Sequence, residues 1–182
     1  MSNKMRFYLS RMHALDSALC VTVNHTSHNR FIRDWFRVFS RLGDGVFWYM
    51  IMIMIVLTQQ QNGVKPVLHM LLVGIAGTLI YKWLKAKTHR PRPYQVHQDV
   101  WVVGKPLDHF SFPSGHTLHA FAFTLVALHY YPSLAIILVP FTVMVAMSRV
   151  ILGLHYPSDV LAGATLGYVI AQFSFLLLMY AV

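Results

Sequence analysis

The sequence predicts an all-α protein: a polytopic bundle of about five to six transmembrane helices with an N-terminal helix at the membrane interface. Composition is the first observation behind this prediction, because 56% of the residues are hydrophobic and only 12% are charged. A soluble domain carries roughly a quarter charged residues. The mean hydropathy of +0.51 agrees with a membrane protein. The apolar residues also gather in runs, and 182 residues leave room for five or six helices of about 20 residues, the length that crosses a bilayer.

Residues 1–41 form a basic region of mixed polarity at the start of the chain. Within it, Ile32, Trp35, Phe36 and Phe39 recur at helical spacing, while the charged residues fall elsewhere. This pattern is typical of a helix that lies in the membrane interface. A helix packed against the bundle has the same pattern, so both alternatives remain open.

Five apolar segments follow, and we expect each to form one span of a bundle over residues 42–182. They cover residues 42–58, 67–85, 113–131, 134–152 and 157–182. Successive spans cross the membrane in opposite directions. The polar segment after the second span, the start of the third and the junction of the fourth and fifth therefore lie on one membrane face. No repeat or boundary divides the chain, so we expect a single domain over residues 1–182.

The first of these three places carries Lys85 and Arg92, seven residues apart at the end of a span. An ammonium and a guanidinium suit the oxygens of one anion, because arginine binds phosphate through two parallel hydrogen bonds and lysine adds a compact charge. Taken alone, this motif is explained as well by basic side chains that extend toward lipid headgroups at a span end.

The second place reads Pro113, Ser114, Gly115 and His116. These residues fit a tight entry into a helix, whose free N–H groups and positive dipole end attract an anion. Gly115 permits close approach to the main chain, and Ser114 adds a hydroxyl donor. His116 follows within reach of the same anion and is able to give a proton. An ordinary turn with a surface histidine is the alternative for this motif alone.

The third place carries Arg149, His155 and Asp159. Arg149 falls inside or at the end of an apolar span, where an unpaired charge is unfavourable, so it is a functional candidate. His155 and Asp159 flank Pro157, which should begin the next helix. A carboxylate there can hold one imidazole nitrogen and leave the other free as a nucleophile. Asp159 as an acidic residue in the first turn of that helix is the alternative.

Together the three motifs, at 85–93, 113–116 and 148–159, supply the parts that phosphoryl transfer requires. These are cationic groups for the phosphate oxygens, a nucleophile with its orienting carboxylate, and a proton donor. The chain has six Asp and Glu residues in total, and they form no cluster suited to magnesium, so we expect no metal and no other cofactor. The single cysteine, Cys20, excludes an intrachain disulfide and a cysteine metal site.

The net charge of +9 favours anionic partners such as phosphate groups and acidic lipid headgroups. Nucleic acid is disfavoured as a partner, because apolar spans interrupt the basic residues. We therefore expect the partners to be the membrane itself and a lipid phosphate substrate within the bilayer.

At these residues the sequence resembles the type 2 phosphatidic acid phosphatase superfamily, which includes bacterial lipid phosphatases and vanadium haloperoxidases. The family pattern K-x6-RP, PSGH and SR-x5-H-x3-D occurs in order within residues 67–175. The resemblance implies an all-helical membrane bundle with His155 as nucleophile, Asp159 as its partner and His116 as acid to the leaving oxygen. It also implies a phosphate cradle of Lys85, Arg92, Ser114, Gly115 and Arg149.

The resemblance implies an integral membrane phosphatase that works without a metal. Its small size and minimal loops resemble the bacterial undecaprenyl diphosphatases, so undecaprenyl diphosphate is the first expected substrate. Phosphatidylglycerophosphate and phosphatidic acid are the alternatives. A lipid-phosphate binder or transporter that does not hydrolyse its ligand is the alternative from another class. Four further residues adjoin the motifs, either as headgroup contacts or as bystanders: His89, Arg90, His109 and His119.

Two observations give conflicting predictions of the membrane face on which the site lies. On the count of five spans, most Lys and Arg residues lie on the side of the motifs, which the positive-inside rule places in the cytoplasm. Carrier-lipid phosphatases of the family usually face outward, and several of these charges belong to the motifs themselves. We therefore expect a protein of the bacterial cytoplasmic membrane whose active site lies on the outer, periplasmic face.

Overall fold

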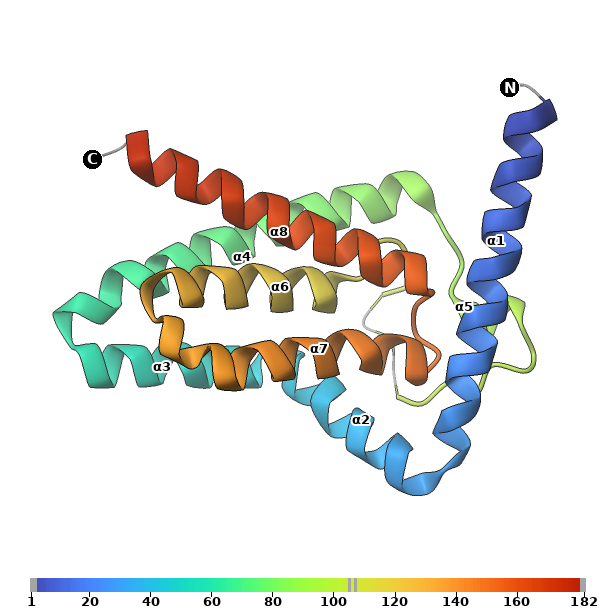
Figure 1. The fold of residues 1–182 in the computed structure, drawn as a ribbon, viewed down its shortest axis with the longest axis horizontal. Coiled ribbons are helices and arrows are strands. Elements are labelled where there is room, and N and C mark those ends of the chain that lie inside the picture. Colours follow the sequence, from blue (N-terminus) through green and yellow to red (C-terminus); the bar gives the residue numbers. More distant parts are fainter. Residues whose placement is uncertain (1–2, 105, 107, 181–182) are drawn as a thin grey trace.

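The computed structural model describes residues 3–104, 106 and 108–180, and this part of the chain is helical and contains no strand (Figure 1). The prediction of an all-α membrane bundle is confirmed. In chain order the elements are α1 (Asn3–Asn24), η1 (His25–His28), α2 (Arg30–Leu42), α3 (Val46–Gln59), α4 (Gln61–Thr88), α5 (Pro93–Val96), α6 (Gly115–Tyr130), η2 (Pro132–Leu134), α7 (Ala135–Ile151) and α8 (Pro157–Tyr180).

Helix α6 lies at the centre of an elongated bundle, where it packs against α4, α7 and α8 (Figure 1). The close packing depends on small residues. A Cβ atom at Gly167 of α8 would lie 2.4 Å from the carbonyl oxygen of Leu118, and one at Gly163 would lie 2.5 Å from that of Ser114. Small residues let helix backbones approach closely in a membrane, where van der Waals contact drives much of helix association.

Among the described residues, three segments are long and apolar enough to cross a membrane by length and composition. They are Gln61–Val96, Pro132–Ile151 and Pro157–Tyr180. Helices α2 and α3 meet at a bend of 52° and make a fourth segment if the pair is one broken span. Helix α6, which we expected to span at 113–131, has 16 residues. At about 1.5 Å per residue it extends roughly 24 Å, less than the hydrocarbon core of about 30 Å.

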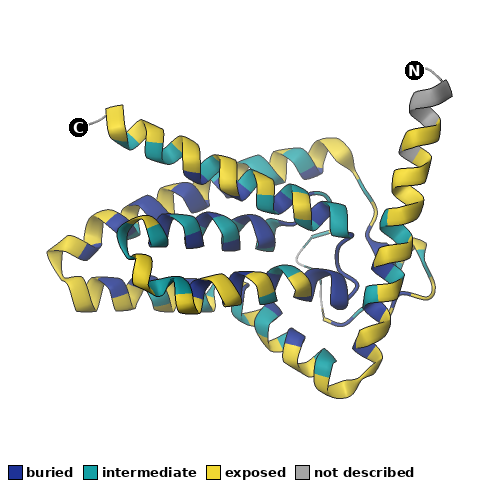
Figure 2. Cartoon of the chain, viewed as in Figure 1, coloured by how far each residue is buried: buried dark blue, intermediate teal, exposed yellow. Residues whose placement is uncertain are grey.

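Exposed residues lie along the outer sides of the helices, and many of the buried residues lie where the helices face one another (Figure 2). Exposed side chains on these faces include large apolar groups such as Leu72 and Leu79 of α4, Ile136 of α7 and Phe173 of α8. In lipid, the helix satisfies its own backbone hydrogen bonds and presents such side chains to the acyl chains. The exterior of the bundle is therefore that of a membrane protein.

Helix α2 covers the segment that we expected at the membrane interface. Phe36 is buried in a cluster with Ile151 and Leu154, so one face of α2 packs on the bundle. Phe31 and Trp35 stack on each other and remain exposed. The helix thus combines a packed face with an exposed aromatic face.

Helix α1 lies across the end of the bundle where the loops after α4 and α7 meet (Figure 1). Asn24, at its last turn, donates to the carbonyl oxygens of Trp101 and Ile151 at 2.9 Å each. It also accepts from the N–H of Trp101 at 2.8 Å. These hydrogen bonds connect α1 to the loop after α5 and to the end of α7, which are distant in sequence and adjoin the motif residues.

Candidate active site

The three motifs meet at one end of the bundle around a cavity of about 400 Å³. Motif residues that line it are Lys85 from the last turn of α4, Arg92 at the start of α5, Gly115 and His116 from the first turn of α6, Arg149 from the last turn of α7, and His155 from the loop before α8. Ser114 and Asp159 are fully buried and do not line it. The structure therefore brings together side chains that lie up to 70 positions apart in the sequence.

The cavity continues from the charged end between α3 and α4. Its walls there are mostly apolar and include Trp48, Met52, Leu71, Ile75 and Leu79. A polar chamber that runs into an apolar groove suits a ligand with a charged head and a hydrocarbon chain.

Asp108 pairs with two of the cationic side chains. Lys85 Nζ donates to its Oδ1 atom at 2.9 Å, and Arg92 Nη2 donates to the same oxygen at 2.6 Å. Burial opposes ionisation of this carboxyl, but the hydrogen bonds and charges of Lys85 and Arg92 outweigh it and lower the pKa of Asp108 below its usual value. One oxygen of Asp108 thus lies between Lys85 and Arg92, the two cations that we expected to bind phosphate.

Arg149 differs from the other two cations, because none of the ion pairs among the described residues includes it. Its Nη1 atom donates to Ser40 Oγ of α2 at 2.5 Å, and its buried Nε atom has no hydrogen-bond partner in the described part of the chain. A buried guanidinium without a counter-ion is unfavourable unless an anion enters the cavity.

His155 is neutral. Burial, followed by the charges of Arg149 and Arg92, lowers the pKa of His155 well below its usual value. Its Nε2 atom lies 3.4 Å from Arg92 Nη1, which can only donate, so the lone pair of Nε2 faces the cationic end of the cavity. A neutral imidazole with its lone pair in this position is able to act as a nucleophile.

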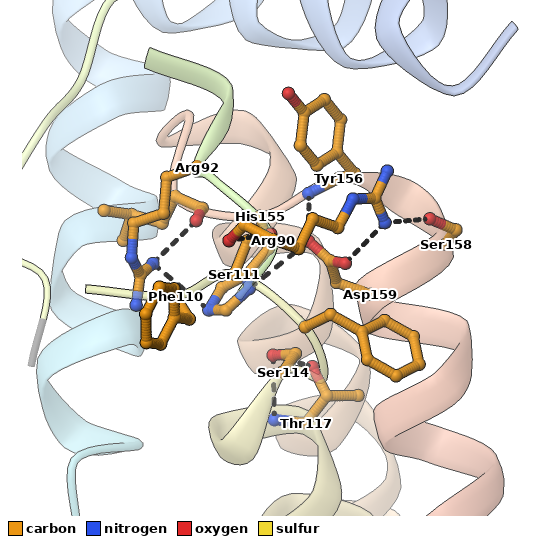
Figure 3. Close-up of polar contacts among 12 residues, drawn as sticks. Arg90, Arg92, Phe110, Ser111, Ser114, Thr117, His155, Tyr156, Ser158 and Asp159 are labelled. Carbon is orange, nitrogen blue, oxygen red and sulfur yellow. Dashed lines mark hydrogen bonds and ion pairs between the residues drawn. The ribbon is translucent and has the colours of Figure 1, made fainter. Parts of the chain in front are cut away.

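The hydrogen bond that we expected between Asp159 and His155 is not formed in this structure. Their closest atoms, Asp159 Oδ2 and His155 Nδ1, are 3.6 Å apart, and Nδ1 has no partner within the described residues. Asp159 is held by other groups instead: Oδ2 accepts from the N–H of Tyr156 at 2.9 Å, and Oδ1 from Arg90 Nη1 at 2.7 Å (Figure 3). These two donors fix the carboxylate just beyond hydrogen-bond distance of the imidazole.

Arg90 is therefore more than a bystander beside the motifs. Besides its ion pair with Asp159, it donates through Nη2 to Asp16 Oδ2 of α1 at 2.6 Å. Asp16 Oδ1 in turn accepts from the N–H of Ser158 at 2.9 Å. Asp16, Arg90 and Asp159 form a chain of charges that joins α1 to the first turn of α8.

Ser114, which we expected to donate to phosphate, contacts helix α6 in this structure. It is the N-cap of α6: its hydroxyl lies 2.9 Å from Thr117 Oγ1 and accepts from the N–H of Thr117 at 3.5 Å (Figure 3). Its own N–H donates to the carbonyl oxygen of Asp159 at 3.0 Å. Because capping uses the hydroxyl, the structure directs it to the helix rather than to the cavity.

His116 forms a hydrogen bond through Nε2 with Oδ1 of Asp44. Asp44 lies between α2 and α3 and lines the cavity. Neither Asp44 nor Asp108 could be recognised from the motifs, since both lie outside them. The only feature of the sequence that could have drawn attention to them is the small number of acidic residues, six against fifteen basic ones.

The remaining histidines beside the motifs divide into two groups. His119 lines the cavity, where its ring nitrogens lie 2.9 Å from the carbonyl oxygen of Gly115 and 3.1 Å from that of Gly74. His89 and His109 do not line it, and His89 packs against Phe110. Within the described residues, no three His, Cys, Asp or Glu side chains are grouped as a metal site requires.

The chain is similar to proteins of a known family. The family model described as PAP2 superfamily matches residues 66–182. The chain is 30% identical over 159 residues to the undecaprenyl-diphosphatase BcrC of Bacillus subtilis, which covers 85% of this chain and 82% of that protein.

Two solved structures share the fold. One is a transmembrane PAP2 type phosphatidylglycerolphosphate phosphatase from Bacillus subtilis, with a TM-score of 0.71 and 25% identity over 90% of this chain and 84% of that chain. The other is LpxE of Aquifex aeolicus, with a TM-score of 0.74 and 28% identity over 87% of this chain and 93% of that chain.

Proposed function

The chain belongs to the PAP2 superfamily and is a membrane phosphatase, and from this premise we propose that it hydrolyses undecaprenyl diphosphate to undecaprenyl phosphate through a phosphohistidine at His155. The observation that carries the proposal is the position of the His155 imidazole within a buried cationic cavity. Lys85, Arg92 and Arg149 surround that cavity with positive charge, and the lone pair of His155 faces it.

The cationic groups bind the phosphoryl group. Arg149 has no counter-ion among the described residues, so a phosphate oxygen supplies the charge that it lacks. Lys85 and Arg92 become available to further oxygens when Asp108 yields its position. The free N–H groups of Gly115 and His116 at the start of α6 add donors at the positive end of the helix dipole.

Hydrolysis then takes two steps. Nε2 of His155 attacks phosphorus while His116 protonates the leaving oxygen, and the cations stabilise the charge that builds on the equatorial oxygens. Water, activated by His116 as base, attacks the phosphohistidine and releases inorganic phosphate. Asp159 stabilises the positive charge on the phosphorylated imidazole from 3.6 Å.

The substrate is assigned from the relatives and from the shape of the cavity. The apolar groove between α3 and α4 suits a hydrocarbon chain. Carrier lipids and phospholipids both have such a chain. Undecaprenyl diphosphate is the first candidate substrate, because the relative named for that activity aligns with this chain over 82% of its length. Phosphatidylglycerophosphate is the second candidate, since the similar structure from Bacillus subtilis is named for it.

Phosphate release by the purified protein in detergent tests this function. We expect the highest kcat/KM for undecaprenyl diphosphate in a panel with phosphatidylglycerophosphate and phosphatidic acid. The His155→Ala protein is the control, and its turnover should fall by several orders of magnitude while its elution profile stays unchanged. A preference for phosphatidylglycerophosphate would correct the substrate, and near-normal turnover by His155→Ala would disprove the phosphohistidine.

A lipid-phosphate transporter predicts a different outcome. Such a protein needs cationic groups to bind its ligand but neither a nucleophile nor a proton donor. It would bind the lipid phosphates of the panel, release no phosphate, and behave the same with alanine at His155.

A further inference from the structure

Asp44 is a carboxylate of the active-site cavity that belongs to none of the three motifs. It lies between α2 and α3, outside the residues 66–182 that match the family model. Its Oδ1 atom is hydrogen bonded to Nε2 of His116, which lies 72 positions away in the sequence. The turn that carries it is closely packed, because a Cβ atom at Gly43 would lie 3.1 Å from Val145 of α7.

We infer that Asp44 is the positioning residue of the proton donor: it holds the ring of His116 so that Nδ1 faces the leaving oxygen, and it stabilises the protonated imidazole. The inference rests on the proposed function, in which His116 protonates that oxygen. It goes beyond the motifs by assigning a task to the segment between α2 and α3.

The surroundings of His116 explain why such a partner is needed. The residue lies in the first turn of α6, at the positive end of the helix dipole, and shares its cavity with the buried Arg149. Both features disfavour a positive charge on the imidazole of His116. A carboxylate in direct hydrogen-bond contact offsets them, because ion-paired hydrogen bonds are roughly twice as strong as neutral ones.

Asp44 itself is well placed to remain ionised. Its side chain keeps 42% of its accessible surface, whereas that of His116 keeps 10%. The carboxylate therefore retains water on one side while its other side contacts the buried ring.

The two histidines of the cavity differ in their contact with a carboxylate. His155 lies 3.6 Å from its nearest carboxylate, without a hydrogen bond. His116 contacts a carboxylate directly, as suits a residue that must carry a proton. A difference in carboxylate contact is a recurrent basis of acid and nucleophile roles for two like groups in one site.

The proton balance follows from these contacts. A bond forms between His155 Nε2 and phosphorus, the bond from phosphorus to the leaving oxygen breaks, and the proton on His116 Nδ1 moves to that oxygen. Neutral His116 then takes a proton from water as the water oxygen bonds to phosphorus. The bond between phosphorus and His155 breaks, phosphate departs, and both imidazoles regain their starting states.

Leaving-group dependence tests the inference, because a poor leaving group requires protonation and a good one does not. The substrates are p-nitrophenyl phosphate and phenyl phosphate, which differ only in the nitro group that stabilises the departing phenolate. Asp44→Asn preserves size and the ability to hydrogen bond but removes the charge. We expect kcat/KM for phenyl phosphate to fall at least tenfold further than kcat/KM for p-nitrophenyl phosphate, within the range that general acids contribute.

Two further variants complete the experiment. His116→Asn should change the ratio of the two rates in the same way, and the double variant should add little, since both residues act in one step. Asp34→Asn, an exposed acidic residue of α2 paired with Arg37, is the matched control and should leave the ratio unchanged.

The outcomes separate the inference from the function on which it rests. If the wild-type protein releases phosphate from no aryl or lipid substrate, the proposed function fails. If the wild-type protein is active and Asp44→Asn lowers both aryl phosphate rates by the same factor, Asp44 supports the fold only and the inference is overturned.

Discussion

At the scale of residues, three carboxylates divide the charged groups of the active site among them. Asp108 pairs with Lys85 and Arg92, and Asp44 contacts His116. Asp159 pairs with Arg90 outside the cavity. Arg149 is left without an ion pair among the described residues, so it has the strongest requirement for an anion from outside.

Asp108→Asn should strengthen product inhibition. The carboxylate competes with phosphate for Lys85 and Arg92, so its removal should lower the inhibition constant of inorganic phosphate. The expected change is roughly fivefold, equivalent to about 1 kcal/mol for one partly exposed ion pair. Asp99→Asn, an exposed acidic residue of the same loop, is the matched control. Weaker inhibition in Asp108→Asn would show instead that Asp108 positions the two cations.

Arg149→Lys should restore little of the activity that Arg149→Ala loses. Lysine keeps the charge but not the planar fork that binds two phosphate oxygens together. The loss in both variants should appear mainly in kcat, with a smaller change in KM, because the contact strengthens in the transition state. Steady-state kinetics on one lipid phosphate measure this, and wild-type turnover in the lysine variant would remove Arg149 from the cradle.

At the scale of elements, the short α6 is the helix on which the site depends. Its first turn carries Gly115 and His116, and its N-cap, Ser114, is bonded through its N–H to the main chain of Asp159 at the start of α8. Gly163 and Gly167 allow α8 to contact α6 at backbone distance. Close packing of these two helices therefore sets where His116 lies relative to the loop of His155.

Gly167→Val should destabilise the protein, because the new side chain would displace α8 from the carbonyl oxygen of Leu118. Overpacking of this kind typically costs about 1–3 kcal/mol, which lowers the melting temperature by several degrees for a chain of this length. Thermal unfolding in detergent measures the change. Thr165→Val, exposed on the same helix, should melt as the wild type does, and equal melting of both variants would contradict the packing argument.

At the scale of the whole molecule, an apolar bundle carries its charged residues largely at one end, where α1 crosses it (Figure 1). The opposite end, at the turn between α3 and α4, contains Gln59 and Gln60. The only cysteine, Cys20, is buried in α1, and burial is the main cause that raises the pKa of its thiol to about 12. Its low reactivity makes the chain suitable for labelling at introduced cysteines.

Labelling should reveal the membrane face of the site. We propose the outer face, so Asp99→Cys should react with a membrane-impermeant maleimide in intact bacterial cells. Gln59→Cys, exposed at the opposite end, should react only after the cells are permeabilised. The reverse pattern would place the active site in the cytoplasm.

Catalysis without a metal gives a prediction for the intact protein. Cationic side chains rather than a metal ion are expected to neutralise the phosphoryl group, so activity should persist in excess chelator. Vanadate should inhibit more strongly than phosphate, because it adopts the trigonal-bipyramidal geometry of the transition state. Activity that disappears in chelator and returns only with magnesium would overturn this expectation.

Much of the fold and most of the active site could be predicted from the sequence, because their signals are local. Apolar runs predict helices from the sequence alone. Lys85 and Arg92, and likewise His155 and Asp159, are only a few residues apart, so the chain itself keeps each pair close together. The bounds of α6 agree with the expected segment 113–131 to within two residues, since the helix begins after its N-cap, Ser114, and ends at Tyr130.

The sequence by itself determined the helical membrane class, the family motifs and the motif residues that meet around one cavity. Only the tertiary structure decided how their charges are paired. His116 meets Asp44, Arg90 meets Asp16, and Asp108 enters the cavity through contacts that span many helices. The physical reason is that hydrogen bonds and ion pairs act over a few ångströms in space, and helix packing alone brings residues so far apart in sequence within that range.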